Sequence, residues 1–404
     1  MAKPEIRIRG FEGEWETHKI GDLTSIVTGA TPSTAMASYW DNGTIRWMSS
    51  GELNDKYIYD VKGRITDEGY HNSGTHLIPP NCVLIGLAGQ GKTRGTAAIN
   101  YVKLCTNQSI AALLPNLKLF NPLYLFHYID NKYLELRNLS TGDGGRGGLN
   151  KQILLDFEVK LTSLEEQQAI AEFFKSLDSL IQTTTKKIAS LKQLKSASLV
   201  SMFPQKGETK PRVRFKGFGG EWKRKCFGDL YYQNIVKNDM TYGTDKIISV
   251  ANMYFSRNSI ISDDNYLKTY NLFRLGDIAF EGNKSKNFAH GRFVENTIGE
   301  GIVSHVFEVF TPKSDKFDLY YWKYAINNER IMGSILVRCT KASTMMTNLV
   351  AKDFLKECTL VPSFEEQKQI GSFFRNLDNQ ISIQEQRLEK LKQIKSACLD
   401  KMFV

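Results

Sequence analysis

The chain has 404 residues, 41% of them apolar and 11% aromatic, enough for two or three domains with buried cores. It contains no run of eighteen apolar residues and no apolar segment near its beginning, so it predicts neither a membrane-spanning helix nor a signal peptide. The six cysteines are scattered, without a CxxC pair or a paired spacing with the six histidines. This argues against a zinc site and a disulfide framework, and for a reducing cytoplasm.

The charge is unevenly distributed along the sequence. The net charge is +10 and the pI about 9.1. Residues 205–362 carry about 24 Lys and Arg against about 17 Asp and Glu, whereas residues 1–162 are nearly neutral. A local basic excess suggests a polyanionic partner such as nucleic acid.

Two halves of the chain open on the same motif. Residues 4–15 are PEIRIRGFEGEW and residues 211–222 are PRVRFKGFGGEW, each followed by Gly-Asp-Leu. A polar, proline-bounded linker, residues 204–212, separates the halves. The chain therefore contains an internal duplication.

The stretch after each opening reads as short strands, because apolar and β-branched runs are bounded by Gly, Asn and Pro. The expected strands are Thr44–Trp47, Cys82–Ile85, Ala97–Val102 and Ile110–Leu114 in the first half, and Ile247–Val250, Asp277–Phe280, Gly291–Val294 and Val306–Phe310 in the second. One helical segment is expected in each half, over 123–139 and 319–332.

A glycine-rich motif follows one of the expected strands. Residues 86–93, GLAGQGKT, match the phosphate-binding pattern GxxxxGK[ST], which requires a helix directly after the loop. The next residues, RGTAAINYV, predict a turn and a strand instead. One interpretation is a nucleotide-binding enzyme; the favoured one is a strand–loop–strand whose tip contacts DNA phosphates or base edges. The candidate DNA-contacting residues are Gln90, Lys92 and Arg94, with Lys284, Lys286, Asn287 and Arg292 in the matching place of the second half.

The sequence offers no catalytic centre. Asn121-Pro-Leu-Tyr124 differs by one residue from the NPPY of adenine methyltransferases, but a glycine-rich S-adenosylmethionine loop is missing, so it is interpreted as a proline-started helix. No Ser/His/Asp set, HExxH motif or paired-carboxylate spacing stands out. We therefore expect a protein that is not an enzyme and holds no metal.

A loop precedes the last segment of each half: STGDGGRGGLN over 140–150 and TKASTMMTN over 340–348. Either these are flexible surface loops, or their backbone approaches nucleic acid closely. In the second case the contacting residues are Arg146, Asn150, Lys341, Ser343 and Thr344.

Each half ends on a long amphipathic segment, 163–204 and 363–404, with roughly 19 of 42 aligned positions identical. Without internal Pro or Gly in the first copy, such a helix reaches roughly 50–55 Å. Apolar residues recur at three- and four-residue steps, near the coiled-coil period, and Thr184 and Gln384 are polar at the same stripe position. The stripe residues are Ile170, Phe174, Leu177, Ile181, Ile188 and Leu191, and Ile370, Phe374, Leu377, Ile381, Leu388 and Leu391.

These stripes allow two arrangements. The helices are either ordinary core helices, one per domain, or they pack against each other or against helices of a partner; their equal length and register favour the pair. The predicted fold class is α+β, with two β-rich globular domains separated by two long antiparallel helices that form a coiled-coil spacer. The expected segments are 1–160, 161–204, 205–360 and 361–404.

Taken together, these motifs resemble the specificity subunit of type I restriction-modification systems. The resemblance rests on the repeated openings, on Glu-Glu-Gln at 165–167 and 365–367, and on Met-Phe at 202–203 and 402–403. It implies two target-recognition domains that each read one half of a bipartite site in double-stranded DNA. It also implies a non-catalytic subunit whose helices set the half-site spacing.

The resemblance further implies partners. Two methyltransferase subunits would dock on the helices, restriction subunits would join through that core, and S-adenosylmethionine, ATP and Mg would be bound by those partners. The alternatives are the nucleotide-binding enzyme described above and a coiled-coil scaffold without DNA binding.

Overall fold

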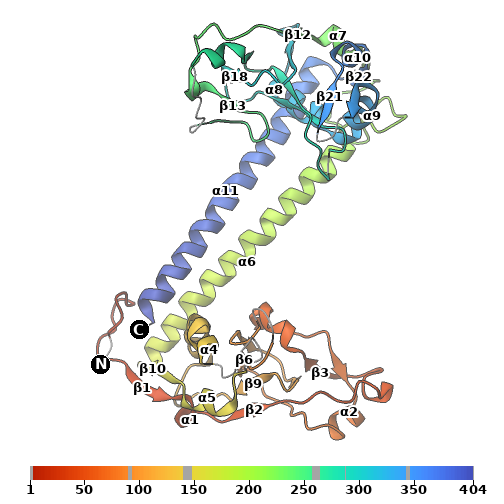
Figure 1. Ribbon diagram of the computed structural model, residues 1–404. Coiled ribbons are helices and arrows are strands. Elements are labelled where there is room, and N and C mark those ends of the chain that lie inside the picture. The colour runs from red at the N-terminus through yellow and green to blue at the C-terminus, as the bar shows by residue number, and fades with distance from the viewer. Residues whose placement is uncertain are drawn as a thin grey trace. The chain divides into compact units, whose positions relative to one another are not determined.

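A computed structural model describes residues 3–89, 93–139, 148–256, 264–286, 288–342 and 346–403. The chain divides into two compact units, which we call the first unit (1–185 and 387–404) and the second unit (186–386). Both ends of the chain, marked in Figure 1, belong to the first unit. The fold class is α+β, as predicted, because each unit combines a β-rich globular part with a stretch of each long helix. Among the described helices, none is both long and apolar enough to cross a membrane.

The first unit is built on a five-stranded sheet accompanied by smaller pairings. The sheet order is β2 (Ile26–Thr28), β9 (Ile110–Leu113), β6 (Val83–Gly86), β7 (Ala97–Asn100) and β4 (Tyr57–Ile58). A second sheet has the order β5 (Arg64–Ile65), β3 (Ile45–Met48), β8 (Cys105–Thr106), and β1 (Glu16–Lys19) pairs with β10 (Glu158–Leu161). The short helices are α1 (Ile20–Leu23), α2 (Asp67–His71), α3 (Pro122–Asn131), α4 (Tyr133–Asn138) and α5 (Lys151–Asp156).

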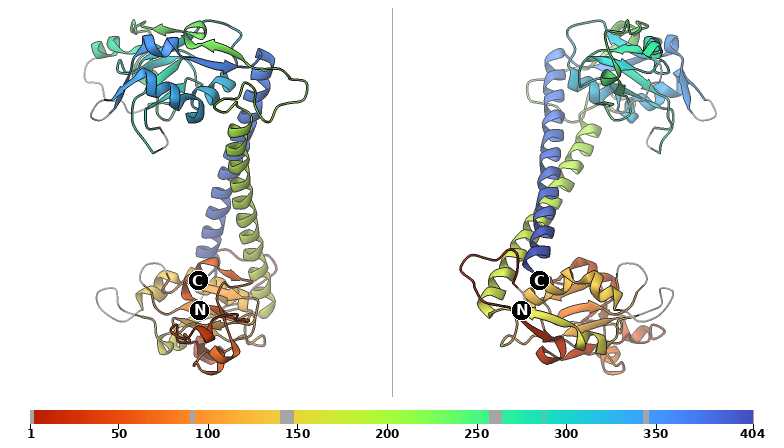
Figure 2. Two further views of the ribbon diagram at one scale, coloured as in Figure 1. Left: turned by 90° about the vertical axis from the view of Figure 1, so that its right-hand side faces the viewer. Right: turned by 60° about the vertical axis from the view of Figure 1, so that its left-hand side comes forward.

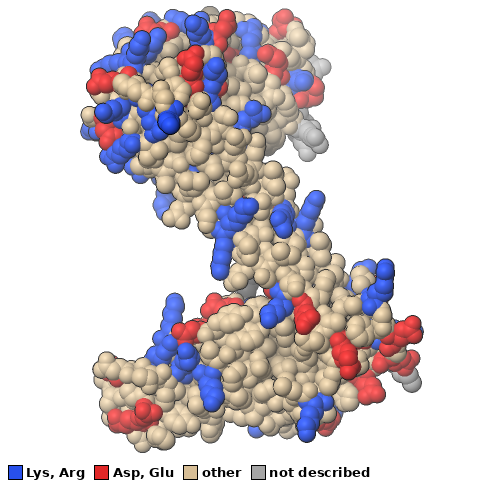
Figure 3. Space-filling view, turned by 180° about the vertical axis from the view of Figure 1, so that it is seen from behind, with Lys and Arg blue, Asp and Glu red and all other residues tan. Residues whose placement is uncertain are grey.

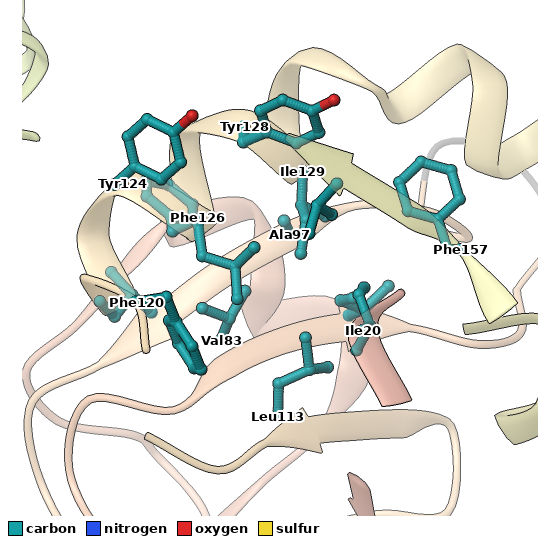
Figure 4. Packing of buried hydrophobic residues seen from close by; sticks show 14 of the residues in the cluster. Ile20, Val83, Ala97, Leu113, Phe120, Tyr124, Phe126, Tyr128, Ile129 and Phe157 are labelled. Carbon is teal, nitrogen blue, oxygen red and sulfur yellow. The ribbon is translucent and has the colours of Figure 1, made fainter. Parts of the chain in front are cut away.

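The core of the first unit lies between this sheet and α3. Every residue of β6, β7 and β9 is buried, as expected of strands whose sequences are continuous apolar runs. Figure 4 shows Val83, Ala97 and Leu113 of the sheet among aromatic residues such as Phe126. Helix α3 starts at Pro122 because the Asn121 side chain accepts hydrogen bonds from two backbone N–H groups of its first turn.

The second unit repeats this plan with different pairings. Its main sheet has the order β12 (Tyr231–Asn234), β19 (Val309–Pro312), β16 (Ile278–Glu281), β17 (Arg292–Glu295). Four strand pairs join it: β11 (Lys223–Cys226) with β22 (Cys358–Val361), β13 (Ile248–Ser249) with β14 (Tyr254–Phe255), β15 (Asn271–Phe273) with β18 (Gly301–Val303), and β20 (Thr340–Ala342) with β21 (Thr347–Leu349). Its short helices are α7 (Phe227–Leu230), α8 (Leu319–Ile326), α9 (Glu329–Cys339) and α10 (Ala351–Lys356).

The two long helices, α6 (Leu164–Ser201) and α11 (Phe364–Met402), run antiparallel within each unit. In the first unit, Phe174 of α6 stacks on Phe403, and Asp178, one turn later in α6, forms an ion pair of 2.6 Å with Lys395, two turns earlier in the chain than Phe403. In the second unit, Asp378 and Lys195 form the same pair with the repeats exchanged, at 2.5 Å. Figure 2 shows the last turns of α11 beside α6 in the first unit. The predicted antiparallel direction is therefore confirmed inside each unit.

The repeated openings fold back onto the starts of these helices. Arg7 makes a two-pronged ion pair of 2.7 Å with the buried carboxylate of Glu166. Arg214 does the same with Glu366, at 2.6 and 2.7 Å. Both arginines also donate to a glycine carbonyl of their own motif, that of Gly13 or Gly220. We call each arrangement the arginine clamp; it explains why Arg, Gly and the Glu-Glu-Gln recur together in the sequence.

The sequence argued against disulfides, and for one pair of cysteines this expectation is wrong. Cys226 and Cys358 lie opposite each other in the antiparallel pair β11–β22 and form a disulfide. They are 132 residues apart, so linear spacing could not reveal the pair. In the first unit the corresponding positions of β1 and β10 hold Lys19 and Glu158.

Candidate nucleic-acid interface

The glycine-rich motif of the first unit lies between two antiparallel strands of one hairpin. Strand β6 ends at Gly86 and the chain returns as β7, antiparallel to it, where a phosphate-binding loop would open a helix. Gly95 donates a backbone hydrogen bond to the Gly86 carbonyl at 2.8 Å. A Cβ atom at Gly86 would lie 2.3 Å from the Thr93 carbonyl oxygen, so the turn requires glycine there. The element that follows the motif is the strand β7, so the helix that a phosphate-binding loop requires is absent from the described residues 93–100.

This hairpin is joined to the segment that precedes α5. The Leu149 N–H donates to the Leu87 carbonyl at 2.8 Å. Two stretches that the sequence analysis singled out separately, one on the hairpin and one before the helix, therefore meet at one place in the first unit.

The second unit has the same junction. The hairpin β16–β17 is joined to β21 because the Thr347 N–H donates to the Gly282 carbonyl at 2.8 Å. The Thr347 hydroxyl donates to the same oxygen at 3.1 Å. A Cβ atom at Gly282 would lie 2.2 Å from the Thr347 carbonyl oxygen, so glycine permits the close approach. Each unit thus has a surface formed by a hairpin and the segment joined to it. We call it the hairpin surface: β6, β7 and Leu149 form it in the first unit, and β16, β17, β20 and β21 form it in the second.

Three lysines that are predicted to contact DNA lie on the second hairpin surface. Lys284 and Lys286 lie in the loop between β16 and β17, and Lys341 lies in β20, opposite Asn348 of β21. All three lysines are exposed. On the face drawn in Figure 3, Lys and Arg side chains lie among Asp and Glu side chains on the globular part of the second unit; the basic excess of residues 205–362 comes from the sequence.

Three further predicted residues have structural contacts of their own. Arg292 of β17 pairs with Glu281 at 2.6 Å and donates to the Ala251 carbonyl at 2.8 Å. Asn150 caps α5 by accepting a hydrogen bond from the Ile153 N–H. Arg94 is half-buried in the hairpin loop. DNA contact by these three residues stays a prediction.

Six predicted residues lie outside the described ranges, so their contacts also stay predictions. They are Gln90, Lys92, Arg146, Asn287, Ser343 and Thr344.

Two amide side chains on the second hairpin surface were not predicted from the sequence. Asn283 and Asn348 are exposed and line a hollow of about 330 Å³, together with Val306, Phe307 and Met346. The alternation of β21 could have indicated Asn348: Thr347 points inward and is buried, so its neighbour points outward.

The long helices offer a second type of surface. The stripe residues Ile170, Phe174, Leu177 and Ile188, and Ile370, Phe374, Leu377 and Ile381, are buried; Ile181, Leu191, Leu388 and Leu391 are half-buried. Outside the stripe, Leu194 and Ile394 are exposed by 47% and 48%. These two residues occupy the same position of the repeat, so both helices carry an equivalent exposed apolar residue.

His127 is a buried titratable residue of the first unit. Burial lowers the pKa of His127 well below its usual range, which keeps the imidazole neutral, with its Nε2 3.5 Å from the Tyr57 hydroxyl oxygen. Within the described ranges, no group of three or more His, Cys, Asp and Glu could hold a metal ion.

Comparison with known families gives two matches along the chain. The model of the type I restriction modification DNA specificity domain matches residues 12–193 and 221–393. Each match covers one globular part and most of the long helix that follows it.

Among curated proteins, the EcoR124I/EcoR124II specificity subunit of Escherichia coli is 27% identical over 177 residues, 43% of either chain. The MjaIX specificity subunit of Methanocaldococcus jannaschii is 28% identical over 195 residues, 47% of this chain and 44% of that one. The chain thus spans under half the length of these two relatives. The MjaVIII specificity subunit of the same organism is 22% identical over 96% of this chain and 91% of its own.

Solved structures share the fold. The S subunit of a type I restriction-modification system from M. genitalium aligns over 100% of this chain and 99% of its own, with a TM-score of 0.63 and 14% sequence identity. A chain from a study of complex assembly in the type I R-M system aligns over 96% of this chain and 97% of its own, with a TM-score of 0.50 and 13% identity.

Proposed function

The chain belongs to the family of type I restriction modification DNA specificity domains, and from this premise we propose that it is the sequence-reading subunit of a type I restriction-modification enzyme. Each unit reads one half of a bipartite site in double-stranded DNA. The subunit itself is not catalytic. Its place of action is the cytoplasm, where its DNA lies.

One observation carries this proposal. The same junction of hairpin and pre-helix segment occurs in both units, through the hydrogen bonds Leu149 to Leu87 and Thr347 to Gly282. The sequences of the two hairpin loops differ: GQGKTRG in the first unit and GNKSKN in the second. One scaffold with two different surfaces fits the reading of two different half-sites, since side chains at base edges specify sequence.

The helices provide the docking sites for partners in this proposal. Two methyltransferase subunits bind along α6 and α11, one near each of the equivalent exposed residues Leu194 and Ile394. Restriction subunits join through this core. The partners bind the cofactors S-adenosylmethionine, ATP and Mg. An apolar side chain exposed at the same position of two repeats fits two copies of one partner.

The basic hairpin surface of the second unit gives a direct test. We expect Lys284→Ala, Lys286→Ala and Lys341→Ala together to weaken duplex DNA binding and to reduce the slope of log K against log salt by about 3, roughly one per lost phosphate contact. Binding is measured by titration at several salt concentrations with the partner subunits present.

Three exposed lysines on other parts of the same unit, Lys210, Lys216 and Lys352, serve as the matched control. Their triple alanine variant has the same net charge but should retain the wild-type slope. Equal slopes for the two triple variants would show that the hairpin surface does not meet DNA.

A further inference from the structure

The hollow on the second hairpin surface is lined by amide, apolar and acidic side chains. We call it the hairpin hollow; it measures about 330 Å³ and is lined by Asn283, Val306, Phe307, Glu308, Met346 and Asn348, among others. Val306 and Met346 are apolar side chains exposed by 58% and 38%. The Glu308 carboxylate accepts a hydrogen bond from Gln233 at 2.6 Å and is thereby held at the wall. A carboxylate repels phosphate, so this hollow suits base edges better than the DNA backbone.

Asn348 is held in position by its strand. It lies in β21, opposite Lys341 of β20, and follows Thr347, whose N–H and hydroxyl both bind the Gly282 carbonyl. Thr347 is buried, so alternation along the strand places Asn348 on the exposed side. Neither the Asn348 amide nor that of Asn283 takes part in a side-chain hydrogen bond within the described parts of the chain. Both amides can therefore bind a ligand.

The residue that directly follows the junction in the first unit, Asn150, has a structural role that Asn348 lacks. Between the junction hydrogen bond and the following helix, the first unit has one residue, Asn150, and its side chain caps α5. The second unit has three residues there, 348–350, and α10 has no side-chain cap. Because of the two extra residues, Asn348 lies at the surface and does not cap the helix.

We propose that the hairpin hollow reads an A·T base pair in the major groove of the second unit's half-site. The Asn348 amide hydrogen-bonds adenine N6 and N7, the bidentate contact that suits an asparagine. Val306 and Met346 contact the thymine methyl group. Lys284, Lys286 and Lys341 hold the flanking phosphates. This inference rests on the proposed function and adds to it one reader residue and one base pair.

The test begins with a selection from random duplex DNA by the full chain with its partner subunits. The wild-type motif should contain an A·T pair at which Asn348→Ala loses its preference, by about 5- to 150-fold in relative affinity. All other positions should stay unchanged. Asn252→Ala, an exposed asparagine outside the hollow, should leave the whole motif unchanged.

Base analogues then test each contact with the wild-type protein itself. At the identified pair, 7-deazaadenine, which lacks the N7 acceptor, should weaken wild-type binding but not that of Asn348→Ala. Uracil in place of thymine should weaken wild-type binding but not that of Val306→Ala combined with Met346→Ala. Because the analogues need no variant to show a loss, a variant that fails to fold does not remove the test.

The outcomes separate two failures. If wild-type protein selects a motif that Asn348→Ala and both analogues leave unchanged at every A·T pair, the hairpin hollow is not a reader and this inference is overturned while the proposed function stands. If wild-type protein selects no motif, the proposed function is overturned as well.

Discussion

A buried carboxyl group in the second unit has no counterpart in the first. Glu295 ends β17, and both its carboxyl oxygens are buried without a hydrogen-bond partner in the described residues. Burial, with a smaller contribution from the charge of Asp318, raises the pKa of Glu295 well above its usual range. The strand pairing places Ile99 at the same position of the first unit. An ionisable group therefore occupies a position where the scaffold accepts an aliphatic one.

The buried Glu295 predicts that the stability of the folded chain depends on pH. The pKa of Glu295 is raised in the folded protein, so above pH about 4.5 the unfolded chain releases a proton that the folded chain retains, and stability falls as pH rises. Burial also raises the pKa of Asp277 to about 6 from 3.8, which adds the same trend over that interval. We expect Glu295→Gln to reduce the loss of stability that accompanies rising pH. The free energy of unfolding at pH 8 should increase by roughly 1–2 kcal/mol.

The measurement is denaturant unfolding of the full chain from pH 4 to pH 8. Glu300→Gln, at an exposed glutamate of the same unit, is the control and should follow the wild-type curve. Identical pH slopes for wild type and Glu295→Gln would mean that Glu295 is not buried in its acid form.

At the scale of elements, the arginine clamp connects each opening motif to the start of a long helix 152 or 159 residues later. The clamped carboxylates of Glu166 and Glu366 are buried, so removal of either arginine leaves a buried charge without its partner. Such a loss costs about 3–5 kcal/mol. We expect Arg7→Ala to lower the free energy of unfolding of the first unit by that amount.

Arg9, exposed two residues along the same motif, provides the control. Arg9→Ala should change stability by less than about 0.5 kcal/mol. Thermal and denaturant unfolding of both variants measure the difference, and equal stability of Arg7→Ala and Arg9→Ala would contradict the clamp.

The disulfide of the second unit ties its first and last strands together. It closes β11 to β22 around the whole globular part between them. A bond that restrains the unfolded chain over so long a loop stabilises by roughly 2–5 kcal/mol. We expect a thiol reductant to lower the melting temperature of the wild-type chain by several degrees.

The first unit supplies a matched control for this bond. Cys226→Lys with Cys358→Glu installs the two residues, Lys19 and Glu158, that lie opposite each other at the same place in the first unit. This variant should fold and lose the response to reductant. A reductant response retained by the variant would assign the effect to other cysteines.

For the molecule as a whole, the long helices could be predicted because their signal is repeated and periodic. The stripe of Ile170, Phe174 and Leu177 returns 200 residues later, and the identical Asp and Lys positions become the interhelix pairs Asp178–Lys395 and Asp378–Lys195. The hairpins were also predictable, since β-branched residues and Gly95 after the glycine-rich motif exclude a helix.

What could not be predicted depends on contacts between distant residues. Residues 87 and 149, or 282 and 347, meet through single backbone hydrogen bonds that leave no pattern in the sequence. The cysteine pair and the buried Glu295 result from strand pairings of the same kind. Strand β19 begins at Val309, three residues later than predicted, because a turn closes between Ser304 and Phe307. Apolarity alone could not separate this turn from the strand.

The central claim is that each unit reads one half-site independently. Its most direct test exchanges residues 20–157, which lie between β1 and β10, for the matching segment of a family member with a different target. This exchange retains the arginine clamp and both long helices. The measurement is the methylated DNA motif in cells that express the chimera with its methyltransferase partners. We predict that one half of the bipartite motif changes while the other half and the unread gap stay as in wild type; a motif altered in both halves, or one without two separate parts, would contradict the claim.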